Sequence, residues 1–169
     1  MLLMRALALG LSVATFAAEA QTWPSKPLRA IVPIAPGSMA DLAARVVFEQ
    51  VSKQLGQPVI VDNRPGAGQT IGASIVAKSE PDGYTLLVNS SAHAIAPSLH
   101  LNLNYHPARD FAAVIPLGIV PNVLVVPPAK GWKTVSDLVA AAKAMPGAMN
   151  YASAGVGTAT HLSAERFRS

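Results

Sequence analysis

Short apolar runs alternate with segments of helical spacing along the first part of the chain. The apolar runs are Leu28–Ile34, Pro58–Asp62 and Tyr84–Asn89, and we expect each of them to form a strand. The intervening stretches Ser38–Leu55 and Ile71–Lys78 space their apolar residues as helices do. Strands that are apolar along most of their length are typical of parallel sheets whose two faces are covered by helices. The order strand–helix–strand–helix–strand therefore predicts an α/β fold with a parallel sheet.

The second part of the chain begins with a polar and irregular stretch, residues 102–111, which we interpret as the passage to a second lobe. Beyond it we expect strands at Ala113–Ile119 and Asn122–Val126, and one more strand at residues 149–154. This organisation predicts three parts, which are a leader at residues 1–20, a first lobe at 21–101 and a partial second lobe at 102–169.

A helix is expected to start at Thr134. Thr134 and Asp137 have the spacing of a capping box, in which each side chain accepts a hydrogen bond from a backbone N–H of the first turn. Pro146 and Gly147 should end this helix. The apolar residues that should face inward are Val135, Leu138, Val139 and Ala142.

The first twenty residues have the pattern of a secretory signal peptide. Arg5 supplies a basic start, residues 6–18 are uncharged, and the small residues Ala18 and Ala20 flank Glu19. The uncharged run is too short for a transmembrane helix, which needs about 20 apolar residues. We therefore expect export, with cleavage after Ala20.

Charge and composition argue against several classes of function. The chain has 13 Lys and Arg against 9 Asp and Glu, a net charge of +4, but the basic residues are scattered singly and form no patch that could follow a nucleic-acid backbone. The chain has no cysteine, and its four histidines lack the spacing of metal ligands. We expect no nucleic-acid partner, no metal and no cofactor.

Functional residues are expected at three places where a strand gives way to a helix. The first is the stretch PIAPGSMAD, residues 33–41, where Ser38 is a good N-cap and Asp41 can cap the same turn. The first N–H groups of a helix have no partner within the helix and carry a partial positive charge. They can therefore hold a carboxylate without any charged side chain. For this junction alone, simple capping is the commoner explanation.

The second junction contains Ser90, Ser91 and His93. Hydroxyl residues at the carboxyl end of a parallel strand lie where open α/β sheets bind their ligands. Serine is also a common turn residue, and an isolated histidine is more often packed or solvated than a ligand. This junction is therefore a weak indication of a binding site when it is taken alone.

The third junction is the stretch SAGVGT, residues 153–158, which opens a helix. Gly155 and Gly157 allow a ligand to approach the backbone, and Thr158 can cap the helix while it offers a hydroxyl. The stretch looks like a dinucleotide-binding fingerprint, but its third glycine is missing and the expected acidic residue would fall beyond the last residue. His161 follows one turn later, where a packed or capping role is commoner than catalysis.

The sequence contains no strong signature of an enzyme. Ser90, His93 and Asp110 could be combined into a triad, but no serine lies in a G-x-S-x-G elbow, and a triad is established by geometry. The carboxylates are spread over turns and caps, so no acid–base pair emerges. We do not expect an enzyme.

Longer motifs connect the three junctions to one family. From Trp23 to the last residue, the chain contains in order WPSKPLRAIVPIAPGSMAD, GQPVIVDNRPGAGQTIGA, PDGYTLLVNSSAHAI, PNVLVV and PGAMNYASAGVGTATHLSAERF. In these motifs the sequence closely resembles the substrate-binding proteins of tripartite tricarboxylate transporters, often called the Bug family. A collinear set of this length is highly specific.

The resemblance implies a periplasmic-binding-protein-like fold of type II, whose two lobes close over a small carboxylate such as a di- or tricarboxylate. It also implies a periplasmic location and delivery of the ligand to membrane permease subunits. In the family, backbone amides and hydroxyls of the binding loops hold the carboxylate together with bridging waters. The positions that carry over as ligand-binding are Pro36, Gly37, Ser38, Ser90, Ser91, His93, Gly155, Gly157, Thr158 and His161, with Asp41 as a helix cap.

The sequence departs from the family in two ways. Ser38 occupies a position where the family commonly has a second glycine, and its hydroxyl could alter which acid fits. Family members are also about twice as long, so we expect a chain truncated at its C-terminus with an incomplete second half.

Other functions stay open at this point. The chain could belong to a different class of solute receptor, for amino acids or oxyanions, or it could be a truncated remnant without function. A less favoured alternative is an exported serine hydrolase that uses Ser90 or Ser91.

Overall fold

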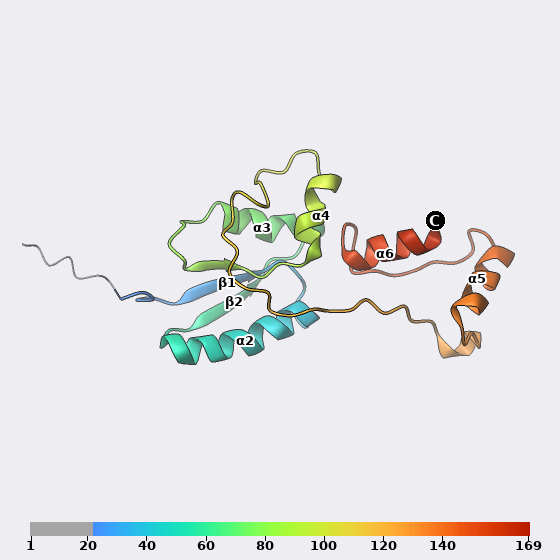
Figure 1. Cartoon of the computed structure of the whole chain (residues 1–169), viewed down its shortest axis with the longest axis horizontal. Coiled ribbons are helices and arrows are strands. Elements are labelled where there is room, and N and C mark those ends of the chain that lie inside the picture. The colour runs from blue at the N-terminus through green and yellow to red at the C-terminus, as the bar shows by residue number, and fades with distance from the viewer. Residues whose placement is uncertain (1–21) are drawn as a thin grey trace, which may run out of the picture.

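A computed structural model describes residues 22–169, and the expected leader with its cleavage after Ala20 lies outside the described residues. Strands and helices alternate through the first part of the chain, and only helices follow it (Figure 1). The elements are β1 (Leu28–Val32), α2 (Met39–Leu55), β2 (Val59–Asn63), the 3-10 turn η1 (Ala67–Gln69), α3 (Thr70–Ala77), β3 (Thr85–Leu87), α4 (Ser91–Leu99), the 3-10 turn η2 (Pro128–Lys130), α5 (Val135–Ala144) and α6 (Ala159–Arg168).

The three strands form the parallel sheet that the sequence predicts. Their order is β2-β1-β3, and both neighbours run parallel to β1. The central strand β1 is the most deeply buried, since Ala30, Ile31 and Val32 are all 0% exposed. A strand that has neighbours on both edges and helices on both faces has little polar environment, which explains the apolar run from Ala30 to Val32.

Successive residues of β1 point to opposite faces of the sheet, and different helices cover the two faces. Ala30 and Val32 join Ala44 and Phe48 of α2 in the main buried cluster. On the other face, α3 lies so close to β1 that a Cβ added at Gly72 would be 3.2 Å from Cγ2 of Ile31. Figure 1 shows α2 on one side of the sheet and α3 with α4 on the other.

Helix α2 begins and ends where the sequence predicts. Ser38 is its N-cap, and the Ser38 side chain accepts a hydrogen bond from the backbone N–H of Asp41. Gly56 ends the helix with φ 65°, in the left-handed region that glycine enters at little cost. Helix α4 was not assigned from the sequence, and it contains Pro97 within its span.

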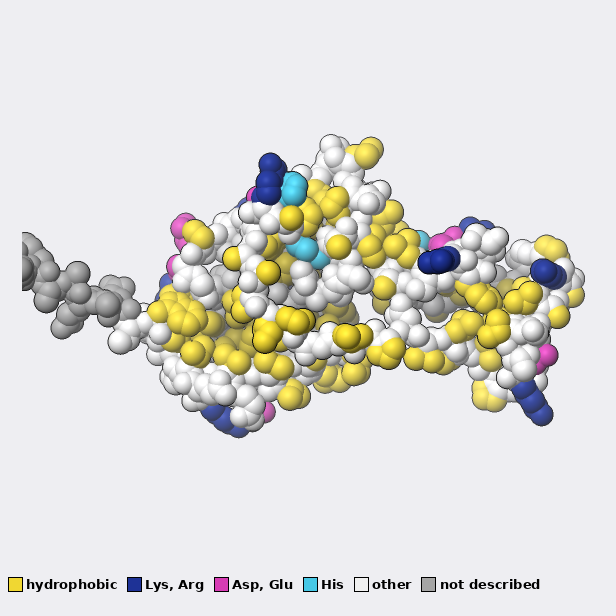
Figure 2. All heavy atoms as spheres, viewed as in Figure 1, with side chains coloured by type: hydrophobic (Ala, Val, Ile, Leu, Met, Phe, Trp, Pro, Cys, Tyr) yellow, Lys and Arg dark blue, Asp and Glu magenta, His cyan; other side chains and the backbone are white. Residues whose placement is uncertain are grey.

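The strands expected at residues 113–119, 122–126 and 149–154 are not formed. Residues 22–169 provide no neighbouring strand with which these segments could pair, and an unpaired segment cannot satisfy its backbone groups as a strand does. The segment that follows residue 111 leaves the sheet as an extended chain (Figure 1). Leu117 packs against the main buried cluster, but most apolar side chains of this segment are exposed, among them Ile119 at 96%. Figure 2 shows hydrophobic side chains along the surface of this stretch.

Helix α5 has its predicted cap but not its predicted burial. Thr134 and Asp137 form both hydrogen bonds of the capping box. The expectation that one face of this helix would be buried is wrong for the described residues, since none of the residues of α5 is buried. Val135 is exposed, and Leu138, Val139 and Ala142 are half-buried.

Within residues 22–169, no helix combines the length and apolar character needed to cross a membrane.

Candidate functional site

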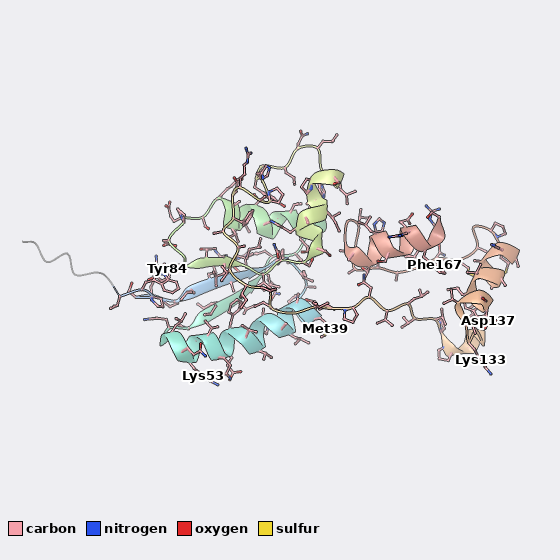
Figure 3. The ribbon with its side chains drawn as sticks, viewed as in Figure 1. Met39, Lys53, Tyr84, Lys133, Asp137 and Phe167 are labelled. Atoms are coloured by element: carbon pink, nitrogen blue, oxygen red, sulfur yellow. The ribbon has the colours of Figure 1, made fainter. Side chains whose placement is uncertain are left out.

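The candidate site lies at the carboxyl edge of the sheet, where β1 leads into α2 and β3 leads into α4. Figure 3 shows Met39 at the end of α2 that faces the C-terminal part of the chain and Lys53 near its opposite end. The loop before α6 reaches this region through the loop before α3, because a Cβ added at Gly68 would lie 3.2 Å from the Val156 carbonyl oxygen and the adjacent Gln69 bonds Ser90. Gly157 itself lies beside Leu99, the last residue of α4. The carboxyl edge of a parallel sheet is where open α/β folds bind ligands.

At the first junction, the open backbone amides follow residues 36–38, which are the positions predicted to bind a ligand. Pro36 has no N–H, the Gly37 N–H donates to Oδ2 of Asp41 at 2.9 Å, and the Ser38 N–H donates to the Ala35 carbonyl at 3.3 Å. Among the hydrogen bonds of residues 22–169, none involves the N–H of Met39 or Ala40. These two first-turn amides are therefore the groups that α2 can offer to an anion.

Asp41 holds the loop of the first junction in place. The residue is 1% exposed, and its side chain accepts hydrogen bonds from the Gly37 N–H, from Nδ2 of Asn63 at 2.9 Å and from Nε of Arg45 at 3.1 Å. Asn63 also donates to the Ile34 carbonyl at 3.0 Å, so the network connects the ends of β1 and β2 to α2.

The charge of Asp41 is compensated locally. The hydrogen bond from Arg45 is the largest cause that lowers its pKa, followed by the Gly37 N–H and Asn63, and together they bring the pKa from 3.8 to about 2. The carboxylate is therefore ionised at neutral pH, and the Arg45 guanidinium beside it balances its charge. A ligand anion at the α2 N-terminus consequently does not face an uncompensated negative charge.

At the second junction, the Ser90 hydroxyl caps α4 and also bonds the side chain of Gln69. The Ser90 hydroxyl accepts a hydrogen bond from the Ala92 N–H at 3.3 Å and donates to Oε1 of Gln69 at 3.0 Å. Ser91 is the first residue of α4, and its side chain is exposed. Ser90 and Ser91 thus lie at the start of α4, in the connection that follows β3.

His93 is placed differently from its neighbours. Its ring stacks on Tyr105 at a centroid distance of 5.9 Å and packs edge-on against Phe111 at 4.8 Å. Its Nε2 lies 3.0 Å from the carbonyl oxygen of Pro107, and its Nδ1 is buried without a hydrogen-bond partner among the described residues. The ring joins α4 to the segment that follows it, and the expectation that His93 contacts a ligand stays a prediction.

The third junction resembles the first, because a glycine precedes a hydroxyl residue that caps the helix. Gly155 and Gly157 have φ of 114° and 83°, and Thr158 caps α6 by accepting from the His161 N–H at 3.3 Å. No hydrogen bond within residues 22–169 involves the N–H of Ala159 or Thr160, so these amides are open in the same way as those of α2.

The side chain of His161 lies beside Tyr151, at a centroid distance of 6.5 Å. Its Nδ1 is buried and has no hydrogen-bond partner in the part of the chain that the structure describes. An unsatisfied buried nitrogen costs free energy unless a further group reaches it. His161 therefore stays a candidate for contact with a ligand.

The loop before α3 belongs to this region as well, and the sequence analysis did not identify it. A Cβ added at Gly68 would lie 3.2 Å from the Val156 carbonyl of the third junction, and Gln69 contacts Ser90 of the second. Ala67 and Gln69 have φ of 45° and 77°, which is uncommon for residues other than glycine. The glycine-rich run PGAGQ directly after the second strand was the available signal.

The first junction does not join the others directly. In residues 22–169, no hydrogen bond connects residues 35–38 with the loop before α3, with Ser90 or with residues 155–158. The structure therefore brings the second and third junctions together around η1 and places the first at the same edge of the sheet.

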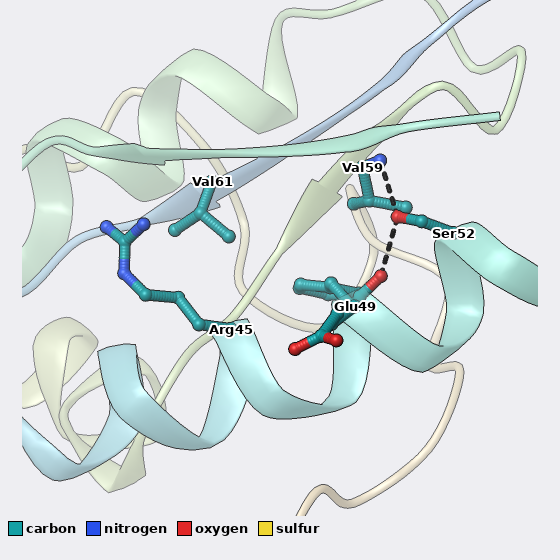
Figure 4. Close-up of a pocket in the computed structure, with 6 residues that line it drawn as sticks. Arg45, Glu49, Ser52, Val59 and Val61 are labelled. Carbon is teal, nitrogen blue, oxygen red and sulfur yellow. Dashed lines mark hydrogen bonds between the residues drawn. The ribbon is translucent and has the colours of Figure 1, made fainter.

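Two hollows lie away from these junctions. One, of about 260 Å³, lies between α2 and the edge strand β2 and is lined by Arg45, Glu49, Ser52 and Val61, among others (Figure 4). The Ser52 hydroxyl in it donates to the Phe48 carbonyl and accepts from the Val59 N–H. The other, of about 360 Å³, adjoins α3 and residues 100–104. Neither hollow includes the open amides of α2 or α6.

The residues considered for catalysis are engaged elsewhere. Ser90 bonds Gln69 and Ala92, and His93 bonds Pro107. Asp110 accepts a hydrogen bond from the His106 N–H, so no triad connects these three side chains within residues 22–169. The described part of the chain also contains no group of three or more His, Asp or Glu residues arranged to hold a metal ion.

Comparison with known proteins adds a family to this geometry. Residues 43–169 match the family described as the tripartite tricarboxylate transporter family receptor. A UPF0065 protein of Bordetella bronchiseptica is 46% identical over 143 residues, which are 84% of this chain and 42% of that protein. The protein BugT of Bordetella pertussis is 41% identical over 152 residues, 89% of this chain and 47% of BugT.

A solved structure of an R. palustris protein with adipate is similar to this chain, with a TM-score of 0.82 and 35% sequence identity. The match covers 86% of this chain and 49% of the R. palustris chain. A structure described as a periplasmic transporter matches with a TM-score of 0.77 and 38% sequence identity, again over 86% of this chain and 49% of the other chain. The α/β fold with its parallel sheet is thus that of periplasmic binding proteins. The chain spans about half the length of the curated relatives it matches.

Proposed function

Because the chain belongs to the receptor family of tripartite tricarboxylate transporters, we propose that it is the periplasmic solute-binding component of such a transporter. In this proposal it binds a small carboxylate, such as a di- or tricarboxylate, between two lobes and delivers it to the membrane permease. The lobes correspond to residues 21–101 and 102–169, the second being partial, and the leader at residues 1–20 directs export.

The observation that carries the proposal is the pair of helix N-termini with open amides. Met39 and Ala40 of α2, and Ala159 and Thr160 of α6, have N–H groups without partners in residues 22–169. Each N-terminus also carries the partial positive charge of its helix dipole. Two such groups can neutralise carboxylates without a lysine or arginine, and glycines at Gly37 and Gly157 let the ligand come close to the backbone.

The hydroxyls of these junctions complete the set of groups that we assign to the ligand. Ser38, Ser90 and Thr158 cap their helices, and each hydroxyl lies beside the amides that it orders. Ser91, His93 and His161 are the remaining side chains of the proposed site. The Nδ1 atoms of both histidines have no hydrogen-bond partner among the described residues.

Isothermal titration calorimetry tests the function. The intact polypeptide, including any residues that follow Ser169, is titrated with adipate, succinate and citrate, and with glucose as a neutral control. We expect saturable binding of at least one acid and no binding of glucose, because open amides at helix N-termini favour anions. Binding of glucose with no response to any of the acids would contradict the proposal.

A further inference from the structure

Gln69 has a backbone conformation that its side chain does not favour. Its φ is 77° and its ψ is 1°, in the left-handed region where glycine is the usual residue. Ala67, two residues earlier, has φ 45°, so the same short loop contains two such positions. Strained residues of this kind persist where the surrounding structure fixes them, and they are concentrated at functional sites.

A specific contact fixes the Gln69 side chain. Oε1 of Gln69 accepts a hydrogen bond from the Ser90 hydroxyl at 3.0 Å, while that hydroxyl accepts one from the Ala92 N–H at 3.3 Å. The single hydroxyl proton of Ser90 is therefore directed to Oε1, and the amide group of Gln69 has a defined orientation. Its Nε2 donates no hydrogen bond to any of residues 22–169, so both N–H groups are open.

The position of Gln69 is between two of the junctions. Ser90, its partner, caps α4 at the second junction, and the adjacent Gly68 lies against the Val156 carbonyl of the third. The Gln69 side chain is half-buried, so part of its surface is open to the surroundings. A neutral donor held in this place can hydrogen-bond an oxygen of a ligand without a charge of its own.

We propose that Gln69 is a specificity-determining residue of the ligand site and that its Nε2 donates a hydrogen bond to a second oxygen-bearing group of the bound acid. The ligand class is then an acid with a second carboxylate or a hydroxyl, rather than a simple monocarboxylate. This inference rests on the proposed function and adds the residue that binds the second polar group of the ligand. Ser90 contributes by holding the amide in its orientation.

The variant Gln69→Gly separates this role from a structural one. Glycine is the residue best suited to φ 77°, so the variant keeps or gains thermal stability while it loses the amide. We expect the dissociation constant for the tightest-binding acid among adipate, succinate and citrate to rise at least fivefold. Binding of hexanoate, which has one carboxylate, should change less than twofold.

Ala67→Gly is the matched control. It relieves the same kind of backbone strain in the same loop but removes no polar group, so its affinity for the acids should equal that of the wild type. Gln69→Glu is a second variant, which places a carboxylate where the amide donates. Repulsion between like charges should then weaken binding of the diacids more than Gln69→Gly does.

The outcomes separate this inference from the function on which it rests. If the wild type binds an acid and Gln69→Gly binds it equally well, the inference is wrong and the proposed function stands. Equal weakening of diacid and hexanoate binding together with a lower melting temperature would show a structural role and would also overturn it. A wild-type protein that binds none of the acids would overturn the proposed function itself.

Discussion

Asp41 shows how one buried carboxylate can order the loop that leads into α2. It joins the Gly37 amide, Asn63 and Arg45, and these donors hold its pKa at about 2 in the folded protein against 3.8 for an unperturbed aspartate. Because the folded-state pKa is the lower one, the ionised carboxylate stabilises the folded state. This contribution is complete above about pH 4 and is lost as the pH falls towards 2.

Melting temperatures of the wild type and of Asp41→Asn, measured between pH 7 and pH 2, test this account. We expect the variant to melt at a lower temperature at pH 7, and we expect the difference to shrink as the pH falls from 4 to 2. Glu80→Gln is the control, because Glu80 is exposed and makes no ion pair within residues 22–169. A gap between wild type and Asp41→Asn that stays constant down to pH 2 would contradict the account.

Capping residues were predictable from the sequence at this scale, and side-chain orientation was not. Ser38, Thr134 and Thr158 cap the expected helices, because capping depends on neighbours within one turn. The packing of His93 could not be predicted, because its environment comes from Tyr105 and Phe111, which reach it through tertiary packing. The role of Gln69 depends in the same way on contact with a distant serine.

At the scale of elements, the close packing of α3 on β1 depends on one glycine. A Cβ added at Gly72 would lie 2.7 Å from Cβ of Pro33 and 3.1 Å from the Arg64 carbonyl. Gly72→Ala should therefore destabilise the protein by about 1–3 kcal/mol, the range expected for overpacking a tight interface. The measurement is chemical denaturation of the variant and the wild type.

Gly118→Ala is the control for this substitution, because nothing lies within 4 Å of a Cβ added at Gly118. It should leave the free energy of unfolding within about 0.5 kcal/mol of the wild type, as is usual for surface changes. If Gly72→Ala proves as stable as Gly118→Ala, the packing of α3 on β1 is looser than the distances at Gly72 indicate.

The sequence predicted elements well where both partners of a contact lie in residues 22–101. The strands β1, β2 and β3 and the helices α2 and α3 were expected within a few residues of their observed bounds, because local periodicity and sheet packing agree there. Ala113–Ile119 and Asn122–Val126 have equally strong strand character, but a strand also requires a partner. Periodicity alone does not show whether a partner is present.

At the scale of the whole molecule, the acid site in our account is shared between two parts of the chain. The sheet with α2 and α4 supplies two helix N-termini, and the chain returns after α5 to place the N-terminus of α6 beside α4 (Figure 1). The motifs of the sequence indicated these loops, and their part in binding an acid stays a prediction. They did not predict that the open amides lie at Met39 and Ala40, because hydrogen bonds to Ala35 and Asp41 occupy the preceding two.

Proline substitution at the first helical position tests the central claim most directly, because it removes one N–H where a helix tolerates proline best. Met39→Pro and Ala159→Pro remove open amides of α2 and α6, and Val135→Pro makes the same change in α5, outside the proposed site. The caps Ser38, Thr158 and Thr134 already have the extended backbone that a following proline requires. Calorimetry with the tightest-binding acid should show an affinity about tenfold weaker or more for Met39→Pro and Ala159→Pro, since a hydrogen bond to a charged group contributes about 1.5–3 kcal/mol. The affinity of Val135→Pro should equal that of the wild type. Unchanged affinity in Met39→Pro and Ala159→Pro, with folding retained, would show that these amides do not hold the acid.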